Sequence, residues 1–186
     1  MALSWESHQQ IRAIMVRIHT SLNQARWDDL AAIFDGAQLV TRYTWSDTPL
    51  VAEGGLRIAS GYRDTFRLHD GLPRVQYTLT NELIEGDDDS GVASSWSQYF
   101  AIAGNERTWS GPRGVDQESG AEAARLQVFI AGRYEDEFRR ADQGWRLTRR
   151  TCHADFTGDR SAHLRLDPYA LRKVGDNTDS SRPSDR

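Results

Sequence analysis

Lysine and cysteine are almost absent from the 186 residues of this chain. Lys173 is the only lysine among 23 basic side chains, and it lies near the C-terminus. The rest of the chain therefore cannot form a Schiff base, hold pyridoxal phosphate through a lysine, or build a lysine-containing phosphate loop. Because Cys152 is the only cysteine, an internal disulfide and a cysteine-rich zinc framework are excluded, and a reducing compartment is expected.

Long apolar runs and basic patches are also missing. No apolar run approaches the roughly 20 residues that a membrane span requires, and the N-terminus lacks the layout of a signal peptide. The net charge is -4, and arginines are scattered among acidic side chains, so nucleic acid is not an expected partner. We expect a cytoplasmic protein that acts without a membrane.

The composition is that of one globular domain. With 38% hydrophobic and 27% charged residues, the chain is long enough to bury a core without a disulfide or structural metal. From about Gly175 onward it has no large apolar residue, which is typical of disorder. We expect a single domain over residues 1–174 and a disordered tail over residues 175–186.

The first half of the chain has mainly helical periodicity. Apolar residues at helical spacing predict a helix from Trp5 to Leu22, a short one from Asp28 to Phe34 and a third from Gly54 to Leu68. The buried stripe expected for the third helix comprises Leu56, Ile58, Tyr62 and Phe66. Residues 39–45 predict a strand between the second and third helices.

After the third helix the period changes to two. Four long strands are predicted, over residues 74–85, 92–103, 126–138 and 145–156. The segment between the second and third of these, residues 104–124, is predicted to be a long loop. Helices followed by a run of antiparallel strands indicate an α+β fold, with the helices packed on one face of a curved sheet.

Several segments, in order, resemble the SnoaL-like group of the NTF2-like superfamily. They are Leu22–Phe34, Thr80–Glu85, Gly132–Asp136, Gly144–Leu147 and Gly158–Leu164. The resemblance implies a cone-shaped α+β barrel with an apolar cavity and no metal or organic cofactor. It also implies kinship with dehydratases, isomerases, polyketide cyclases and epoxide hydrolases, and with the non-catalytic β subunit of ring-hydroxylating dioxygenases. Fold and function are only loosely tied in such families.

The resemblance places a catalytic acid at Asn23 and a catalytic histidine at Tyr77. Asparagine cannot accept a proton, and an unperturbed tyrosine titrates near pH ~10, so the usual His-Asp mechanism is in doubt. Tyr77 shares a predicted strand face with Val75, Leu79 and Asn81. Its phenol could donate a hydrogen bond to a substrate oxygen, with Asn23 positioning the same group. The alternative is a core tyrosine bonded to backbone.

Arg150 stands where the resemblance implies an arginine that steadies a leaving group. Trp145 and Leu147 share parity with Arg149 and not with Arg150, so unless a β-bulge intervenes only one of the two arginines can face inward. His153 shares that same parity and could replace the missing base. The alternatives are a surface arginine paired with a glutamate and a histidine satisfied at the sheet edge.

The expected lining of the cavity is aromatic with a few polar groups. It includes Asn23, Phe34, Tyr43, Asn81, Trp96 and Gln98. Such a lining favours a flat, apolar ligand. His153 and Asp155 are too few ligands for a metal site, so no metal is expected. The remaining histidines, including His19, are interpreted as solvent-facing or capping residues.

Three functions follow, in order of preference. The first is a cofactor-independent cyclase, dehydratase or isomerase of secondary metabolism, in which Tyr77, Arg150 and His153 act on an apolar, oxygenated, polyketide-like substrate. The second is a ligand-binding or dioxygenase β-subunit-like module, and the third is an epoxide hydrolase. A homodimer or other homo-oligomer is expected from the resemblance.

Overall fold

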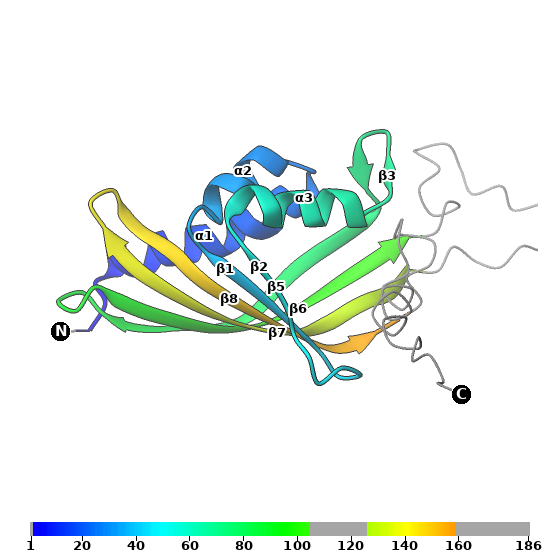
Figure 1. Cartoon of the computed structure of the whole chain (residues 1–186). Coiled ribbons are helices and arrows are strands. Elements are labelled where there is room, and N and C mark those ends of the chain that lie inside the picture. Colours follow the sequence, from blue (N-terminus) through cyan, green and yellow to red (C-terminus); the bar gives the residue numbers. More distant parts are fainter. Residues whose placement is uncertain (1, 105–125, 159–186) are drawn as a thin grey trace, which may run out of the picture.

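The computed structural model describes residues 2–104 and 126–158. The long loop predicted after the second long strand and the tail predicted from residue 175 lie outside the described residues, apart from Gly104. The described residues form three helices, six main strands and a small hairpin (Figure 1). The helices are α1 (Trp5–Asn23), α2 (Trp27–Ile33) and α3 (Gly55–Thr65). The strands are β1 (Gln38–Tyr43), β2 (Leu50–Glu53), β5 (Val75–Asp87), β6 (Val92–Gly104), β7 (Leu126–Ala141) and β8 (Gly144–Thr157), and a small hairpin holds β3 (Leu68–His69) and β4 (Leu72–Pro73).

The six main strands form one curved, open sheet in the order β2-β1-β8-β7-β6-β5. Strands β1 and β8 pair in parallel, and all other neighbours are antiparallel. Helices α1, α2 and α3 all lie against one face of the sheet, here called the helix-covered face, and the opposite face is called the outer face (Figure 1). The α+β prediction is confirmed, with the helices and the curved sheet together forming the cone.

Helix α1 forms where its apolar period predicts it. The Ser4 hydroxyl accepts a hydrogen bond from the Ser7 amide at 3.2 Å and so caps the first turn. The apolar stripe is buried against the sheet; its members are Ile11, Met15, Ile18 and Leu22. This helix fixes the helix-covered face as the side where the core lies.

Two short elements escaped the sequence analysis. Strand β2 has four residues, and the β3–β4 hairpin has two residues in each strand, which is too short for a recognisable period. Helix α3 ends at Thr65, because Phe66 is extended. Leu56 was predicted to be buried, but it is 79% exposed. Ile58 and Phe66 are buried as predicted.

A β-bulge in β8 decides which side chains face the helices. Glu137 pairs with Arg149 and Phe138 with Leu147, so Thr148 is the extra residue. The bulge reverses the alternation, and Leu147, Arg150 and Cys152 are all buried on the helix-covered face. Arg150, rather than Arg149, is therefore the inward-facing arginine.

Candidate functional site

A cavity of about 280 Å³ lies on the helix-covered face, between the sheet and α3. Its walls are largely apolar, and they come from β1, β2, α3, β5, β6, β7 and β8. The lining residues are Leu39, Thr41, Tyr43, Leu50, Val51, Ala52, Arg57, Ile58, Gly61, Tyr62, Thr65, Phe66, Tyr77, Tyr99, Phe129, Ile130, Tyr134 and Cys152. An apolar hollow with a few polar groups is the usual form of a small-molecule site.

All five tyrosines of the described residues line this cavity. They are Tyr43, Tyr62, Tyr77, Tyr99 and Tyr134, each from a different element. Burial raises the pKa of Tyr62, Tyr99 and Tyr134 above the ordinary tyrosine value. These phenols stay protonated at neutral pH and can donate hydrogen bonds, but they cannot serve as bases.

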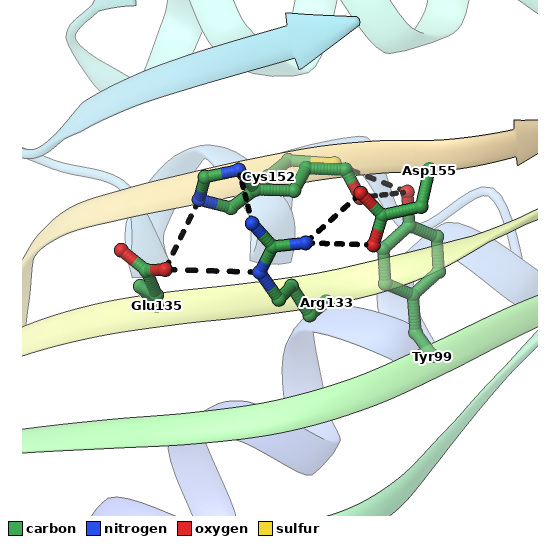
Figure 2. A network of polar contacts seen from close by, with 6 residues as sticks. Tyr99, Arg133, Glu135, Cys152 and Asp155 are labelled. Atoms are coloured by element: carbon green, nitrogen blue, oxygen red, sulfur yellow. Dashed lines mark hydrogen bonds and ion pairs between the residues drawn. The ribbon is translucent and has the colours of Figure 1, made fainter. Parts of the chain in front are cut away.

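The rings of Tyr99 and Tyr134 stack at 4.1 Å between centroids. The Tyr99 hydroxyl lies 3.3 Å from the Cys152 sulfur and donates to the His153 carbonyl at 3.4 Å (Figure 2). Burial raises the pKa of the Cys152 thiol to about 11, although the Tyr99 contact and the Arg150 charge oppose the rise. The thiol is therefore protonated at neutral pH and is a poor nucleophile.

Arg150 and Asp136 form a buried ion pair beneath the tyrosines. Arg150 donates from Nε to Oδ1 at 2.8 Å and from Nη2 to Oδ2 at 2.7 Å, and the two side chains are 1% and 0% exposed. Burial alone would lower the pKa of Arg150, but the Asp136 charge and hydrogen bonds outweigh it and raise the pKa. The guanidinium also lies over the Tyr134 ring, 4.2 Å from its centroid. Arg150 was predicted to meet the substrate, but it contacts Tyr134 instead and does not line the cavity.

His19 is a buried histidine, although it was predicted to be a solvent-facing or capping residue. The structure shows it 5% exposed on α1, with its ring 5.4 Å from that of Tyr134. Nδ1 lies 2.9 Å from the Met15 carbonyl oxygen and must donate to it, while Nε2 has no partner among the described residues. Burial and then the Arg150 charge lower the pKa of His19 to about 3, so the ring is neutral.

Asn23 binds backbone rather than lining the cavity. Its Nδ2 donates to the Tyr77 carbonyl at 2.9 Å, and its Oδ1 accepts from the Tyr77 amide at 2.7 Å. Both ends of the amide are thus used to fasten the end of α1 to β5. Tyr77 itself lines the cavity, as the strand pattern predicted.

Three other residues predicted to line the cavity, Phe34, Tyr43 and Asn81, lie in three different environments. Tyr43 lines the cavity, whereas Phe34 is fully buried in the core and lies outside the lining. Asn81 was predicted to point inward with Tyr77, but a bulge between Thr80 and Leu83 ends that alternation. Asn81 is exposed and donates to the Gln98 side chain.

Trp96 and Gln98 lie on the outer face, contrary to expectation. Trp96 is 37% exposed, and Gln98 is exposed as well. The opposite face of β6 buries small residues under the helices instead, namely Ala93, Ser95, Ser97, Ala101 and Ala103, with Tyr99 among them. The helices pack close to the sheet and leave room mainly for small side chains on this face of β6. Trp96 therefore lies on the outer face.

His153 also lies on the outer face, because the bulge at Thr148 reverses its expected orientation. Arg133 donates to His153 Nδ1 at 3.2 Å and binds both carboxylate oxygens of Asp155 at 2.9 Å (Figure 2). Glu135 lies 3.2 Å from His153 Nε2. His153 therefore belongs to a network of polar contacts on the outer face and does not line the cavity.

A second hollow of about 410 Å³ lies on the outer face. It is lined mostly by charged and polar residues; these include Arg42, Glu85, Glu135, Glu137 and Arg149. Arg149 and Glu137 already pair across it at 3.7 Å. The smaller cavity is the better candidate site, because apolar walls remove a ligand from water and surface ion pairs do not.

Two features are absent from the part of the chain that the structure describes. No group of three or more His, Cys, Asp or Glu side chains is placed to hold a metal ion. Among the same residues, no helix combines the length and apolarity needed to cross a membrane. Asp28 and Asp29, the acids in the first turn of α2, do not line the cavity, and Asp29 pairs with Arg26.

Solved structures share this architecture at low sequence identity. A cystatin-like protein of unknown function from Nostoc punctiforme has a TM-score of 0.59 at 18% identity, covering 83% of this chain and 96% of that one. A protein described as the β subunit of an aromatic-ring-hydroxylating dioxygenase, from Novosphingobium aromaticivorans, has a TM-score of 0.57 at 15% identity, covering 80% and 88%. A protein assigned as a dehydratase of the NTF2-like family, from Streptomyces avermitilis, has a TM-score of 0.53 at 13% identity, covering 82% and 97%.

The helices, the open curved sheet and these likenesses define the fold as a cone-shaped α+β fold. The model of the SnoaL-like domain matches residues 4–151. The chain therefore belongs to the SnoaL-like domain family. No curated protein matches it in sequence.

Proposed function

We propose that this chain is a cofactor-independent enzyme of cyclase, dehydratase or isomerase type in secondary metabolism. Its substrate would be an apolar, oxygenated, polyketide-like ring compound held in the cavity. The observation that carries the proposal is the convergence of five tyrosines from five elements on one apolar hollow. Phenols in such a place can donate hydrogen bonds to a carbonyl oxygen and stabilise negative charge that develops there.

The step common to these reactions is enolisation of a ketone. The bond between an α-carbon and its hydrogen breaks, the electron pair moves into the enolate, and the carbonyl oxygen accepts hydrogen bonds from the phenols. Among the described lining residues there is no carboxylate or imidazole to take the proton. In this proposal the proton passes to water, and the protein contributes by stabilising the enolate oxygen.

Tyr77 and Tyr134 are the proposed donors. Tyr99 already uses its hydroxyl on Cys152 and the His153 carbonyl, whereas the Tyr134 hydroxyl has no hydrogen-bond partner among the described residues. Asn23 fixes the backbone of Tyr77, and Arg150 holds the ring of Tyr134. Asn23 and Arg150 are therefore positioning residues, and preorganised donors stabilise an oxyanion best.

Hydrogen exchange tests this proposal without knowledge of the natural substrate. The ring ketone 2-tetralone and the diketone benzoylacetone would be incubated with the protein in D₂O, and loss of the α-proton signal followed by NMR. The protein should accelerate exchange, and Tyr77→Phe should reduce the acceleration at least about tenfold, since it removes one oxyanion donor. Trp96→Phe, an aromatic change on the outer face, should leave the rate unaltered. Exchange no faster than in buffer for both ketones would contradict the proposal.

A second candidate function is a non-catalytic ligand-binding or dioxygenase β-subunit-like module. The observation that favours it is the lack of a proton acceptor among the described lining residues. The two functions differ in their partners. A β subunit should co-purify with a larger iron–sulfur α chain, whereas a free enzyme should elute alone.

The same proposal includes a cytoplasmic homo-oligomer whose partner is the small-molecule substrate. Sedimentation of the purified chain would report its oligomeric state. A single species at 21.1 kDa would contradict the oligomer.

A further inference from the structure

Among the described residues that line the cavity, Arg57 is the only charged one. It lies on the first turns of α3 and is exposed. It forms no ion pair with any described residue, whereas Arg63 on the same helix pairs with Asp64 at 3.2 Å. The guanidinium of Arg57 is thus a permanent positive charge at the cavity, and no carboxylate of residues 2–104 or 126–158 pairs with it.

The exposed part of the described cavity lining, here called its mouth, comes from β2 and α3. The most exposed of its lining residues come from these two elements: Leu50 and Val51 from β2, and Arg57 and Gly61 from α3. Leu50 and Val51 are 56% and 47% exposed. A ligand that enters would therefore meet apolar side chains on one side of the mouth and a cation on the other.

The polar groups of the lining are biased toward hydrogen-bond donors. The cavity contains five phenols, two threonines, one thiol and one guanidinium, and no Asp or Glu among the described lining residues. Burial keeps the phenols of Tyr62, Tyr99 and Tyr134 protonated. Phenols and hydroxyls can both donate and accept, but a guanidinium only donates. A ligand rich in acceptors, with its acidic group at the mouth, complements this set.

We infer that the cavity selects acidic ring compounds: the apolar rings occupy the tyrosine-lined interior, and a carboxylate or similar anion binds Arg57 at the mouth. This inference rests on the proposed function, because it assigns a substrate class to the same cavity. It also assigns Arg57 a role in specificity. The guanidinium can bind a carboxylate through two parallel hydrogen bonds, and a surface position lets that group remain partly hydrated.

A pair of fluorescent probes separates the charge from the apolar body. 8-Anilinonaphthalene-1-sulfonate carries an anionic group, and N-phenyl-1-naphthylamine is the same ring system without it. Both would be titrated into the wild-type chain and into Arg57→Ala, Arg57→Lys and Arg63→Ala. Displacement of the neutral probe by the anionic probe establishes that they share one site. Thermal unfolding of each variant establishes that it is folded, which is expected because both arginines are exposed.

The anionic probe should bind Arg57→Ala about threefold to tenfold more weakly than the wild type, with partial recovery in Arg57→Lys. The neutral probe should change less than twofold, and Arg63→Ala should resemble the wild type for both probes. Added salt should weaken binding of the anionic probe to the wild type more than to Arg57→Ala.

Three results would overturn the inference, and they are distinguishable. If both probes bind and Arg57→Ala affects neither, the cavity stands but its preference for acids does not. If Arg63→Ala weakens the anionic probe as much as Arg57→Ala, the effect is one of general surface charge. If neither probe binds the wild type, the ligand cavity of the proposed function fails together with the inference.

Discussion

Arg150 and Asp136 bring two opposite charges into the core beneath Tyr134. Both side chains are essentially inaccessible, and two hydrogen bonds join them. Removing one partner of such a pair leaves a buried charge without compensation. Replacing both with apolar residues avoids that cost. The pair can therefore be separated experimentally into its electrostatic and its packing contributions.

Asp136→Asn and Arg150→Met should each lower the free energy of unfolding by about 3–5 kcal/mol. The double variant Arg150→Met with Asp136→Leu should recover most of that loss. Urea denaturation at neutral pH measures all three. The matched control is Arg133→Met, which breaks the Arg133–Asp155 pair on the outer face, where the side chains are 37% and 32% exposed. That change should cost about 1 kcal/mol or less. Equal losses at the two sites would contradict the account.

His19 links the stability of the chain to pH. Its pKa is about 3 in the folded chain, against an ordinary value of 6.5. Between these values the unfolded chain binds a proton that the folded chain excludes. Stability is therefore complete above pH ~6.5 and falls with acidification, at about 1.4 kcal/mol per pH unit from this one group.

His19→Asn should flatten this dependence, because asparagine retains a donor for the Met15 carbonyl and does not titrate. Between pH 6.5 and 5 the wild type should lose about 2 kcal/mol more than the variant does. Urea denaturation at both pH values supplies the comparison. Parallel losses in the two proteins would show that His19 is not held neutral in the folded chain.

At the scale of elements, glycine sets how closely α3 approaches α2. A Cβ atom on Gly55 would lie 1.8 Å from the Ala31 carbonyl oxygen, whereas a Cβ on Gly61 would meet nothing within 4 Å. Both glycines lie on α3. Replacing each glycine with alanine therefore separates the effect of close packing at Gly55 from the effect of helix propensity at Gly61.

Gly61→Ala should raise the free energy of unfolding by about 0.5–1 kcal/mol through helix propensity. Gly55→Ala should lower it by about 1–3 kcal/mol, because backbone must move to admit the methyl group. Thermal denaturation of the two variants gives the comparison directly. Stabilisation by both would mean that α2 and α3 are not in close contact at Gly55.

The long elements with a regular apolar period could be predicted from the sequence, but the β-bulges within them could not. Alternation located β5 to β8 to within three residues at each end. It could not locate the extra residue at Thr148, and that bulge alone decides that Arg150 faces the cavity side and His153 the outer face. Asn81 follows the same logic: it adopts a left-handed φ of 51° at a bulge in β5, a conformation that asparagine tolerates well.

The buried ion pair beneath the tyrosines could have been predicted from a charged residue on an otherwise apolar strand face. In β7, Tyr134 and Phe138 alternate with charged residues, and Asp136 falls on their side of the strand. An acid on a buried face requires a partner, and this signal would have pointed to Arg150. His19, between Ile18 and Leu22 on the buried side of α1, carries a weaker signal of the same kind.

At the scale of the whole molecule, the cavity depends on contacts between distant segments. Tyr43, Tyr62, Tyr77, Tyr99 and Tyr134 lie on β1, α3, β5, β6 and β7. No local spacing links them, so they could not be grouped from the sequence. The parallel pairing of β1 with β8 brings the first strand beside the last, and the resemblance to the SnoaL-like group was the only sequence signal for that arrangement.

The most direct test of the tyrosine-lined cavity is NMR of the chain labelled with ¹³C at the tyrosine ring carbons. The added ligand would be 2-naphthol, which mimics the enol of 2-tetralone, and single Tyr→Phe variants would assign the signals. The signals of Tyr43, Tyr62, Tyr77, Tyr99 and Tyr134 should move together as the site fills, while the indole signal of Trp96 on the outer face stays in place. Five unmoved tyrosine signals at saturating 2-naphthol, or a shift at Trp96 instead, would contradict the account.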